Sequence, residues 1–208
     1  PALLVQHPLY DNFGERIPQD TAREKLQLPK EEKIILFFGF IRKYKGLDLL
    51  LDAMADSRIK EQNIKLLIAG EFYEDEKPYL QKIEQKGLAN SLYLHTHFIA
   101  DGVVKYYLSA ADAVIQPYRA ATQSGVTPLA YYFEKPMVVT NVGGLPDLVP
   151  HQKAGLVCEP QPTAIADAIL LLYQKGIESF IPHLRIEKQK YSWPVLVKTI
   201  TDLAKKTS

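Results

Sequence analysis

The stretch Lys33-Ile34-Ile35-Leu36-Phe37-Phe38, ended by Gly39, decides the fold of this chain. A continuously apolar run of this length is typical of a strand that is covered on both faces. Leucines and a methionine then recur at three- and four-residue spacing over 47–54, which predicts a helix with one face toward a core. A covered strand followed by such a helix is the first part of a βαβ unit.

The same alternation continues along the chain. Further strands are predicted at 64–69, 92–95, 113–116, 137–140 and 155–158, and further helices at about 77–86, 103–111, 125–133 and 163–173. Strands separated by helices pair in parallel through right-handed crossovers. The prediction is an α/β fold, a Rossmann-like doubly wound parallel sheet with helices on both faces.

We expect a single domain over 1–208, made of three parts. Residues 1–32 form an N-terminal linker with one short helix, 33–175 form the α/β core, and 176–208 form C-terminal helices. An apolar stripe after Pro194 predicts a terminal helix that docks on this domain. The first residue is a proline rather than a methionine, so we expect that the chain was cut from a longer protein.

Charge and composition exclude several classes of protein. The 25 Lys and Arg residues nearly balance the 24 Asp and Glu residues, which disfavours binding to nucleic acid or to an anionic membrane. The only cysteine, Cys158, excludes an internal disulfide framework and a Cys-rich zinc site. We find no span or signal segment, so we expect a cytoplasmic protein, with peripheral membrane contact only through a missing half.

Ligands of open parallel sheets bind beyond the carboxyl ends of the strands, so the loops there are the candidate sites. The loop 39–46 carries Arg42, Lys43 and Lys45 between two glycines. Its cations could neutralise a phosphate, although a solvated basic loop is the plainer alternative. Glu71 directly follows the second strand and could either meet a ligand hydroxyl or be a surface carboxylate.

A second candidate follows the strand at 113–116. Because Pro128 must lie in the first turn of a helix, Ser124 falls near the N-cap. The backbone N–H groups of Gly125, Val126 and Thr127 should then point outward at the positive end of the helix dipole. Such an end suits a phosphate, although it could also be an ordinary capped helix start.

A third loop, after the strand at 137–140, contains Gly143 and Gly144. The two glycines predict a tight turn with room for a ligand beside the backbone. No Gly-x-Gly-x-x-Gly follows the first strand, which disfavours hydride chemistry with NAD. We expect no metal, since the five histidines lack a metal-binding spacing with carboxylates.

In this order, these stretches resemble the C-terminal half of the family-4, "group 1" retaining glycosyltransferases. The resemblance rests on Gly39…Lys45-Gly46, on LLIAGE at 66–71, on YLSAADAVIQP at 107–117 and on KPMVVTNVGGLP at 135–146. It implies one half of a GT-B fold, whose C-terminal domain binds a nucleotide sugar. The missing N-terminal domain of the same chain would bind the acceptor.

The resemblance also implies roles for single residues. Lys45 matches the lysine, after Gly39, that contacts the donor diphosphate, while the position of the motif's arginine holds Phe40, with Arg42 two residues later. Glu71 follows the strand that lies near the nucleoside. The turn that binds the distal phosphate matches Ser124, Gly125 and Val126.

The family's two glutamates are absent. Aligned on Gly125, their positions hold Thr122 and Ala130, and aligned on Pro136 they hold Ala121 and Leu129. Neutral Thr122 or Gln123 would then contact the sugar and ribose by hydrogen bonds alone.

The implied function is transfer of a sugar, with retention, from a nucleoside-diphosphate sugar to a saccharide or lipid-linked acceptor. No metal or cofactor is expected, no catalytic residue is assigned, and the fragment alone should be inactive. The missing glutamates leave open a non-catalytic nucleotide-sugar-binding or scaffolding module. A sugar-nucleotide epimerase of related fold is disfavoured, since no carboxylate and histidine set occupies the cleft positions.

Overall fold

The computed structural model describes residue 9 and residues 12–207. At its centre lies a six-stranded parallel sheet in the order β3-β2-β1-β4-β5-β6. The strands are β1 (Lys33–Phe38), β2 (Ile64–Ala69), β3 (Leu92–His95), β4 (Ala113–Gln116), β5 (Met137–Thr140) and β6 (Gly155–Cys158). All six lie where the sequence predicts them, which confirms the Rossmann-like doubly wound sheet.

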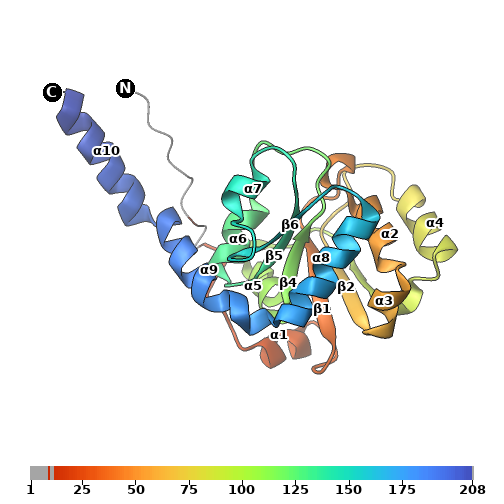
Figure 1. The fold of residues 1–208 in the computed structure, drawn as a ribbon. Coiled ribbons are helices and arrows are strands. Elements are labelled where there is room, and N and C mark those ends of the chain that lie inside the picture. Colours follow the sequence, from red (N-terminus) through yellow and green to blue (C-terminus); the bar gives the residue numbers. More distant parts are fainter. Residues whose placement is uncertain (1–8, 10–11, 208) are drawn as a thin grey trace.

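Helices cover both faces of this sheet (Figure 1). On one face of the sheet, α2, α3 and α8 pack together, and α4 packs against α2. On the other face, α1 packs on α5 and α6 packs on α9. The helices are α1 (Gln19–Lys25), α2 (Leu47–Met54), α3 (Ser57–Glu61), α4 (Lys77–Gln85), α5 (Asp101–Ala110), α6 (Val126–Tyr132), α7 (Leu145–Leu148), α8 (Pro162–Lys175), α9 (Ile181–Lys188) and α10 (Trp193–Thr207). Four 3-10 turns join them, namely η1 (Lys43–Lys45), η2 (Ala89–Ser91), η3 (Ile177–Phe180) and η4 (Gln189–Tyr191).

The strand order reverses between β1 and β4, and this reversal positions the site. The chain runs from β1 outward to β2 and β3, and then crosses back to β4, which pairs with β1 through Ile35 opposite Ala113. The loops after β1 and β4 therefore leave neighbouring strands in opposite directions. A crevice at such a point is the usual ligand site of this fold class.

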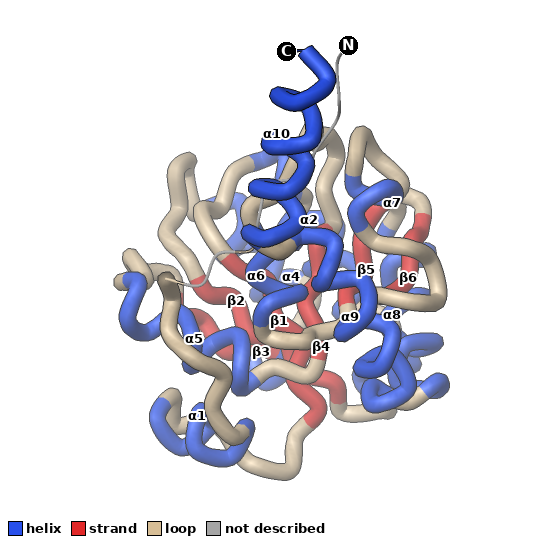
Figure 2. Tube along the Cα trace, turned by 90° about the vertical axis from the view of Figure 1, so that its left-hand side faces the viewer, coloured by secondary structure: helices blue, strands red, loops and turns tan. Residues whose placement is uncertain are grey.

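The terminal helix does not dock as the sequence predicts. Helix α10 is present, but it projects beyond the sheet layers (Figures 1 and 2). Large side chains of its apolar stripe are 43–58% exposed, namely Trp193, Val195, Val197 and Ile200. The predicted apolar stripe is present, but α10 leaves η4 in a direction that points away from the sheet. No helix among the described residues is both long and apolar enough to cross a membrane.

Candidate functional site

Lys45 lies at the centre of the candidate site, at the end of η1. Its side chain is buried, and its Nζ lies 5.9 Å from the centroid of the Tyr118 ring. Within the described part of the chain, no carboxylate pairs with this ammonium. Burial, and next the positive charge of Arg42, lowers the pKa of Lys45 from 10.5 to about 8. A buried cation without a counterion is a natural partner for an anionic group of a ligand.

Gly39 makes room for this ammonium. Its φ is +92°, and a Cβ at this position would lie 3.0 Å from the Lys45 Nζ. The loop that follows is held in place by a parallel bridge between Ile41 and Phe72, with the Ile41 N–H donating to the Glu71 carbonyl at 2.8 Å. The loops after β1 and β2 therefore form one rigid rim beside Lys45.

A cavity of about 250 Å³ opens beside Lys45. It brings together four of the residues predicted from the sequence, namely Gly39, Lys45, Glu71 and Val126. Asp101 also lines it, and the other lining residues carry no charge: Phe13, Phe38, Phe40, Gly70, Phe98, Ile99 and Val104. A flat, largely apolar group would fit there, next to a single cation.

A larger and more open cavity, of about 670 Å³, contains Thr122 and Gln123. Tyr44 also lines it, whereas the neighbouring Lys45 lines the first cavity, so the two cavities flank η1. The sequence did not single out Arg119, which lines this second cavity and pairs with Asp48 at 2.5 Å. Its position directly after Pro117-Tyr118 at a strand end was the available signal.

Ser124 lies near the N-cap of α6 as predicted, but one backbone N–H of the first turn differs from the prediction. The helix begins at Val126 and Gly125 is its N-cap residue, while the buried Ser124 Oγ accepts the Val126 N–H at 3.2 Å. That N–H group is therefore occupied rather than pointing outward. Ser124 in turn donates to the Gln116 Oε1 at 2.6 Å, and Thr127 donates to the same oxygen at 3.1 Å.

Tyr118 and Gln116 support the candidate site from below the surface, and the sequence did not single them out. Tyr118 is 3% exposed, and its ring lies near the Lys45 ammonium. Its hydroxyl forms a hydrogen bond with the Ser124 Oγ at 3.2 Å. Gln116 ends an otherwise apolar strand and is buried. A polar side chain at the end of an apolar strand is the sequence signal for the hydrogen bonds among Gln116, Ser124 and Thr127.

Arg42 and Gly143 were also candidates, and the structure places them differently. Arg42 does not line either cavity; it is exposed, and its guanidinium lies 5.1 Å from the centroid of the Tyr73 ring. Gly143 lines the open cavity, as the sequence predicts. The absence of a side chain also lets its loop pack closely on another, because a Cβ there would lie 1.5 Å from the Ala121 carbonyl oxygen.

The comparisons with known proteins identify the family. The family model described as "Glycosyl transferases group 1" matches residues 18–192, and the chain belongs to this family. A D-inositol 3-phosphate glycosyltransferase from Corynebacterium urealyticum is 28% identical over 199 residues, which are 91% of this chain and 47% of that protein. The chain spans about half the length of the curated relatives it matches.

Solved structures show the same fold. The Anabaena protein HepE, in complex with UDP-glucose, superposes with a TM-score of 0.77 at 21% identity, covering 95% of this chain and 57% of that one. The C-terminal domain of a group 1 glycosyltransferase from Francisella tularensis gives a TM-score of 0.71 at 18% identity, covering 86% of this chain and 94% of that domain. The fold is that of one domain of a GT-B glycosyltransferase.

Proposed function

We propose that this chain is the donor-binding half of a retaining glycosyltransferase that uses a nucleoside-diphosphate sugar. The observation that carries the proposal is the buried, unpaired ammonium of Lys45 between two cavities at the carboxyl edge of the sheet. Membership of the group 1 family supports it, as does the UDP-glucose bound by HepE.

In this proposal each cavity takes one end of the donor. The nucleoside occupies the apolar cavity, with Glu71 within reach of its hydroxyl groups. The diphosphate lies over Lys45 and the N-terminus of α6. The sugar occupies the open cavity, where Thr122, Gln123 and Arg119 offer hydrogen bonds in place of two carboxylates.

The chemistry asked of this domain is electrostatic. The bond between the sugar's anomeric carbon and the distal phosphate oxygen breaks, and a bond to the acceptor oxygen forms on the same face of the sugar. The nucleoside diphosphate leaves with the bonding electrons and accepts the acceptor's proton. The Lys45 ammonium stabilises the charge that builds on the leaving phosphate, in a position where burial excludes water. This scheme requires no metal or other cofactor.

An acceptor-binding surface must face the donor site, and this chain does not account for it. Because the relatives are about twice as long, we propose that an N-terminal domain of the same protein binds the saccharide or lipid-linked acceptor. The exposed apolar stripe of α10 supports contact with further protein. The present chain alone should bind donor and transfer nothing.

Calorimetric titration of UDP, GDP and ADP tests the proposal. Lys45→Ala should weaken binding of the preferred nucleotide by about 1–3 kcal/mol, the range for one charge-assisted contact. Lys43→Ala is the matched control, because Lys43 lies in the same turn but is exposed and lines neither cavity of the donor site. Equal affinity for the wild type and Lys45→Ala would refute the role of Lys45.

A non-catalytic nucleotide-sugar-binding module is the second candidate. The observation in its favour is the loss of both family carboxylates, since Thr122 is exposed and neutral and Ala130 is fully buried. Turnover by the full-length protein, assayed with donors of the preferred base and a set of acceptors, separates the two. Tight donor binding without any transfer or donor hydrolysis would favour the module.

A further inference from the structure

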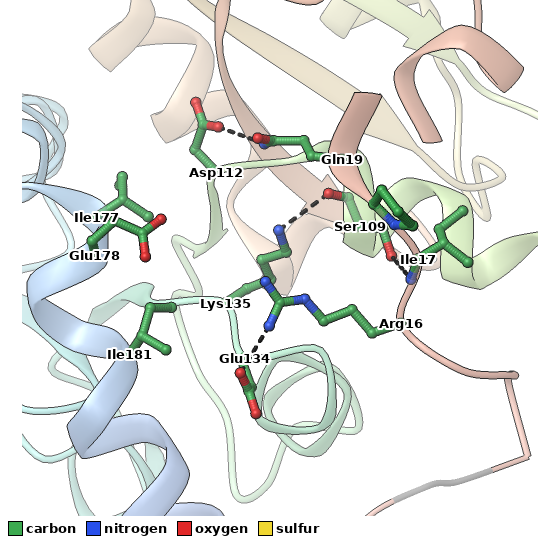
Figure 3. A pocket seen from close by; sticks show the side chains of 11 residues that line it. Arg16, Ile17, Gln19, Ser109, Asp112, Glu134, Lys135, Ile177, Glu178 and Ile181 are labelled. Atoms are coloured by element: carbon green, nitrogen blue, oxygen red, sulfur yellow. Dashed lines mark hydrogen bonds and ion pairs between the residues drawn. The ribbon is translucent and has the colours of Figure 1, made fainter. Parts of the chain in front are cut away.

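A cavity of about 430 Å³ lies at the edge of the sheet opposite the candidate donor site (Figure 3). Asp112 directly precedes β4 and Lys135 lies just before β5, so both stand where the strands begin. The remaining walls come from the N-terminal segment 16–19 and from 177–181, where η3 passes into α9. None of these residues belongs to the donor site.

Lys135 is the unusual group in this cavity. It is 7% exposed, and its Nζ donates to the carbonyl oxygens of Ser109 at 3.1 Å and Ala111 at 2.7 Å. Both acceptors are neutral, and in the described part of the chain no carboxylate forms an ion pair with it. Burial, and next the positive charge of Arg16, lowers the pKa of Lys135 to about 8. Two carbonyls account for two of its three N–H donors.

Arg16 brings a second cation to the same space. Its Nη1 donates to Glu134 at 2.8 Å, which uses one of the five donors of the guanidinium. Figure 3 shows Arg16 and Lys135 both reaching into the region that the lining residues enclose. Like charges that share a poorly solvated space repel each other, and an anion placed between them removes that cost.

Two of the three carboxylates on the walls already have partners. Glu134 accepts from Arg16, from Arg185 at 3.0 Å and from Lys188 at 2.9 Å. Asp112 accepts from four donors, namely the side chains of Gln19, Arg23 and Tyr173 and the backbone N–H of Ile34. The third acid, Glu178, is exposed. Arg23, Arg185 and Lys188, which hold Asp112 and Glu134, join Arg16 and Lys135, so five cations surround the cavity against three carboxylates and the net charge there is positive.

We propose that this cavity is a second ligand site, which takes a small hydroxylated organic anion of the polyol phosphate type. The anionic group lies between Arg16 and Lys135. The volume exceeds what an inorganic anion fills, and Gln19 and Glu178 offer polar atoms to hydroxyl groups. The side chains of Ile177 and Ile181 line the remaining wall, where they would contact the carbon chain of the ligand. The ligand would tie the N-terminal segment to η3 and α9.

Sorbitol 6-phosphate, sorbitol and inorganic phosphate are suitable probes for calorimetric titration of the full chain. We expect sorbitol 6-phosphate to bind, sorbitol not to bind, and inorganic phosphate to bind at least about tenfold more weakly, since it lacks the hydroxyl contacts. Equal affinity for inorganic phosphate and sorbitol 6-phosphate would overturn the assignment to a polyol phosphate. Absence of binding by every probe would overturn the site.

Arg16→Gln is the decisive variant, because its side chain is 48% exposed and the substitution should leave folding intact. It should weaken sorbitol 6-phosphate binding about tenfold, the effect of losing one charge-assisted contact. Arg185→Gln is the matched control: Arg185 bonds the same Glu134 oxygen but does not line the cavity, so its loss should leave affinity unchanged. An equal loss of sorbitol 6-phosphate affinity in the two variants would show that the ion pairs of Glu134, and not a contact from Arg16 to the ligand, determine binding. That result would contradict the proposal.

The variant Lys45→Ala distinguishes binding of the probe in this cavity from binding in the donor site. Sorbitol 6-phosphate should bind this variant with wild-type affinity, because Lys45 lies at the other edge of the sheet. Loss of binding in Lys45→Ala, with retention in Arg16→Gln, would place the probe in the donor site and overturn the inference. Lys135→Gln adds a direct test of the amine wherever a melting curve shows that the variant is folded.

Discussion

The ammonium of Lys45 lies 5.9 Å from the ring centroid of Tyr118, and the hydroxyl of that tyrosine is 3.2 Å from the Ser124 Oγ. The turn after β1 and the start of α6 thus share one buried aromatic ring. Since Ser124 also accepts the Val126 N–H, the candidate cation and the helix start are held in a fixed relation. This rigid relation is what a preorganised diphosphate site requires.

Binding of a nucleoside diphosphate should take up a proton near pH 8. In the free protein the pKa of Lys45 is about 8, so about half of the molecules are neutral there. An anion beside the amine restores the charged form and raises that pKa, so the complex binds about half a proton more at this pH. Calorimetry in buffers of different ionisation enthalpy measures the uptake.

The uptake should vanish at pH 6.5, where Lys45 is already protonated, and in Lys45→Ala at both values of pH. Affinity should fall as the pH rises above 8, because protonation then costs free energy. Binding at pH 8 without proton uptake would show that Lys45 does not face the diphosphate.

Gly39→Ala should destabilise the domain by about 1–2 kcal/mol and weaken nucleotide binding. The φ of +92° is strained for alanine, and the new methyl group would lie 3.0 Å from the Lys45 Nζ. Urea unfolding measures the free energy and calorimetry the affinity. Gly102→Ala is the control, since nothing lies within 4 Å of its Cβ position in α5 and its stability should stay equal or rise. Equal behaviour of the two variants would argue against a special role for Gly39.

Ser124→Ala should cost about 1–2 kcal/mol of unfolding free energy. The substitution leaves the Val126 N–H without its acceptor and removes the donor to the buried Gln116 Oε1. Thr122→Ala, two residues earlier but exposed, should change stability by less than about 0.5 kcal/mol. A Ser124→Ala variant as stable as Thr122→Ala would contradict the network described for the start of α6.

The sheet could be predicted because its central strands, β1, β2, β4 and β5, are covered on both faces. Such strands form unbroken apolar runs, and β1 shows this with Ile34 to Phe37 all buried. The loops at the carboxyl ends followed from the same pattern, so Lys45, Glu71 and Val126 could be proposed together before their shared cavity was known.

Side-chain direction and distant pairing could not be predicted from the sequence. Tyr118 turns inward because Ser124 offers its hydroxyl a partner, and Arg119 meets Asp48 across 71 positions of the chain. The apolar stripe of α10 predicts a helix, but it does not predict whether the helix packs on this domain. The Lys135 cavity combines four distant segments and corresponds to no motif.

Glu134→Gln should lower stability at neutral pH and lose this effect in acid. One carboxylate holds Arg16, Arg185 and Lys188, so its replacement should cost about 1–2 kcal/mol at pH 7.

Burial raises the pKa of Glu134, but hydrogen bonds from Lys188 and Arg185 outweigh it and hold the pKa below its usual 4.5. A depressed carboxyl pKa contributes stability that is complete above 4.5 and disappears as the pH falls through the folded-state value. Urea midpoints of wild type and Glu134→Gln should therefore differ at pH 7 and converge as the pH falls below the folded-state pKa of Glu134. A difference that persists unchanged in acid would show that the glutamine disturbs packing at this left-handed position, where φ is +54°, rather than the charge.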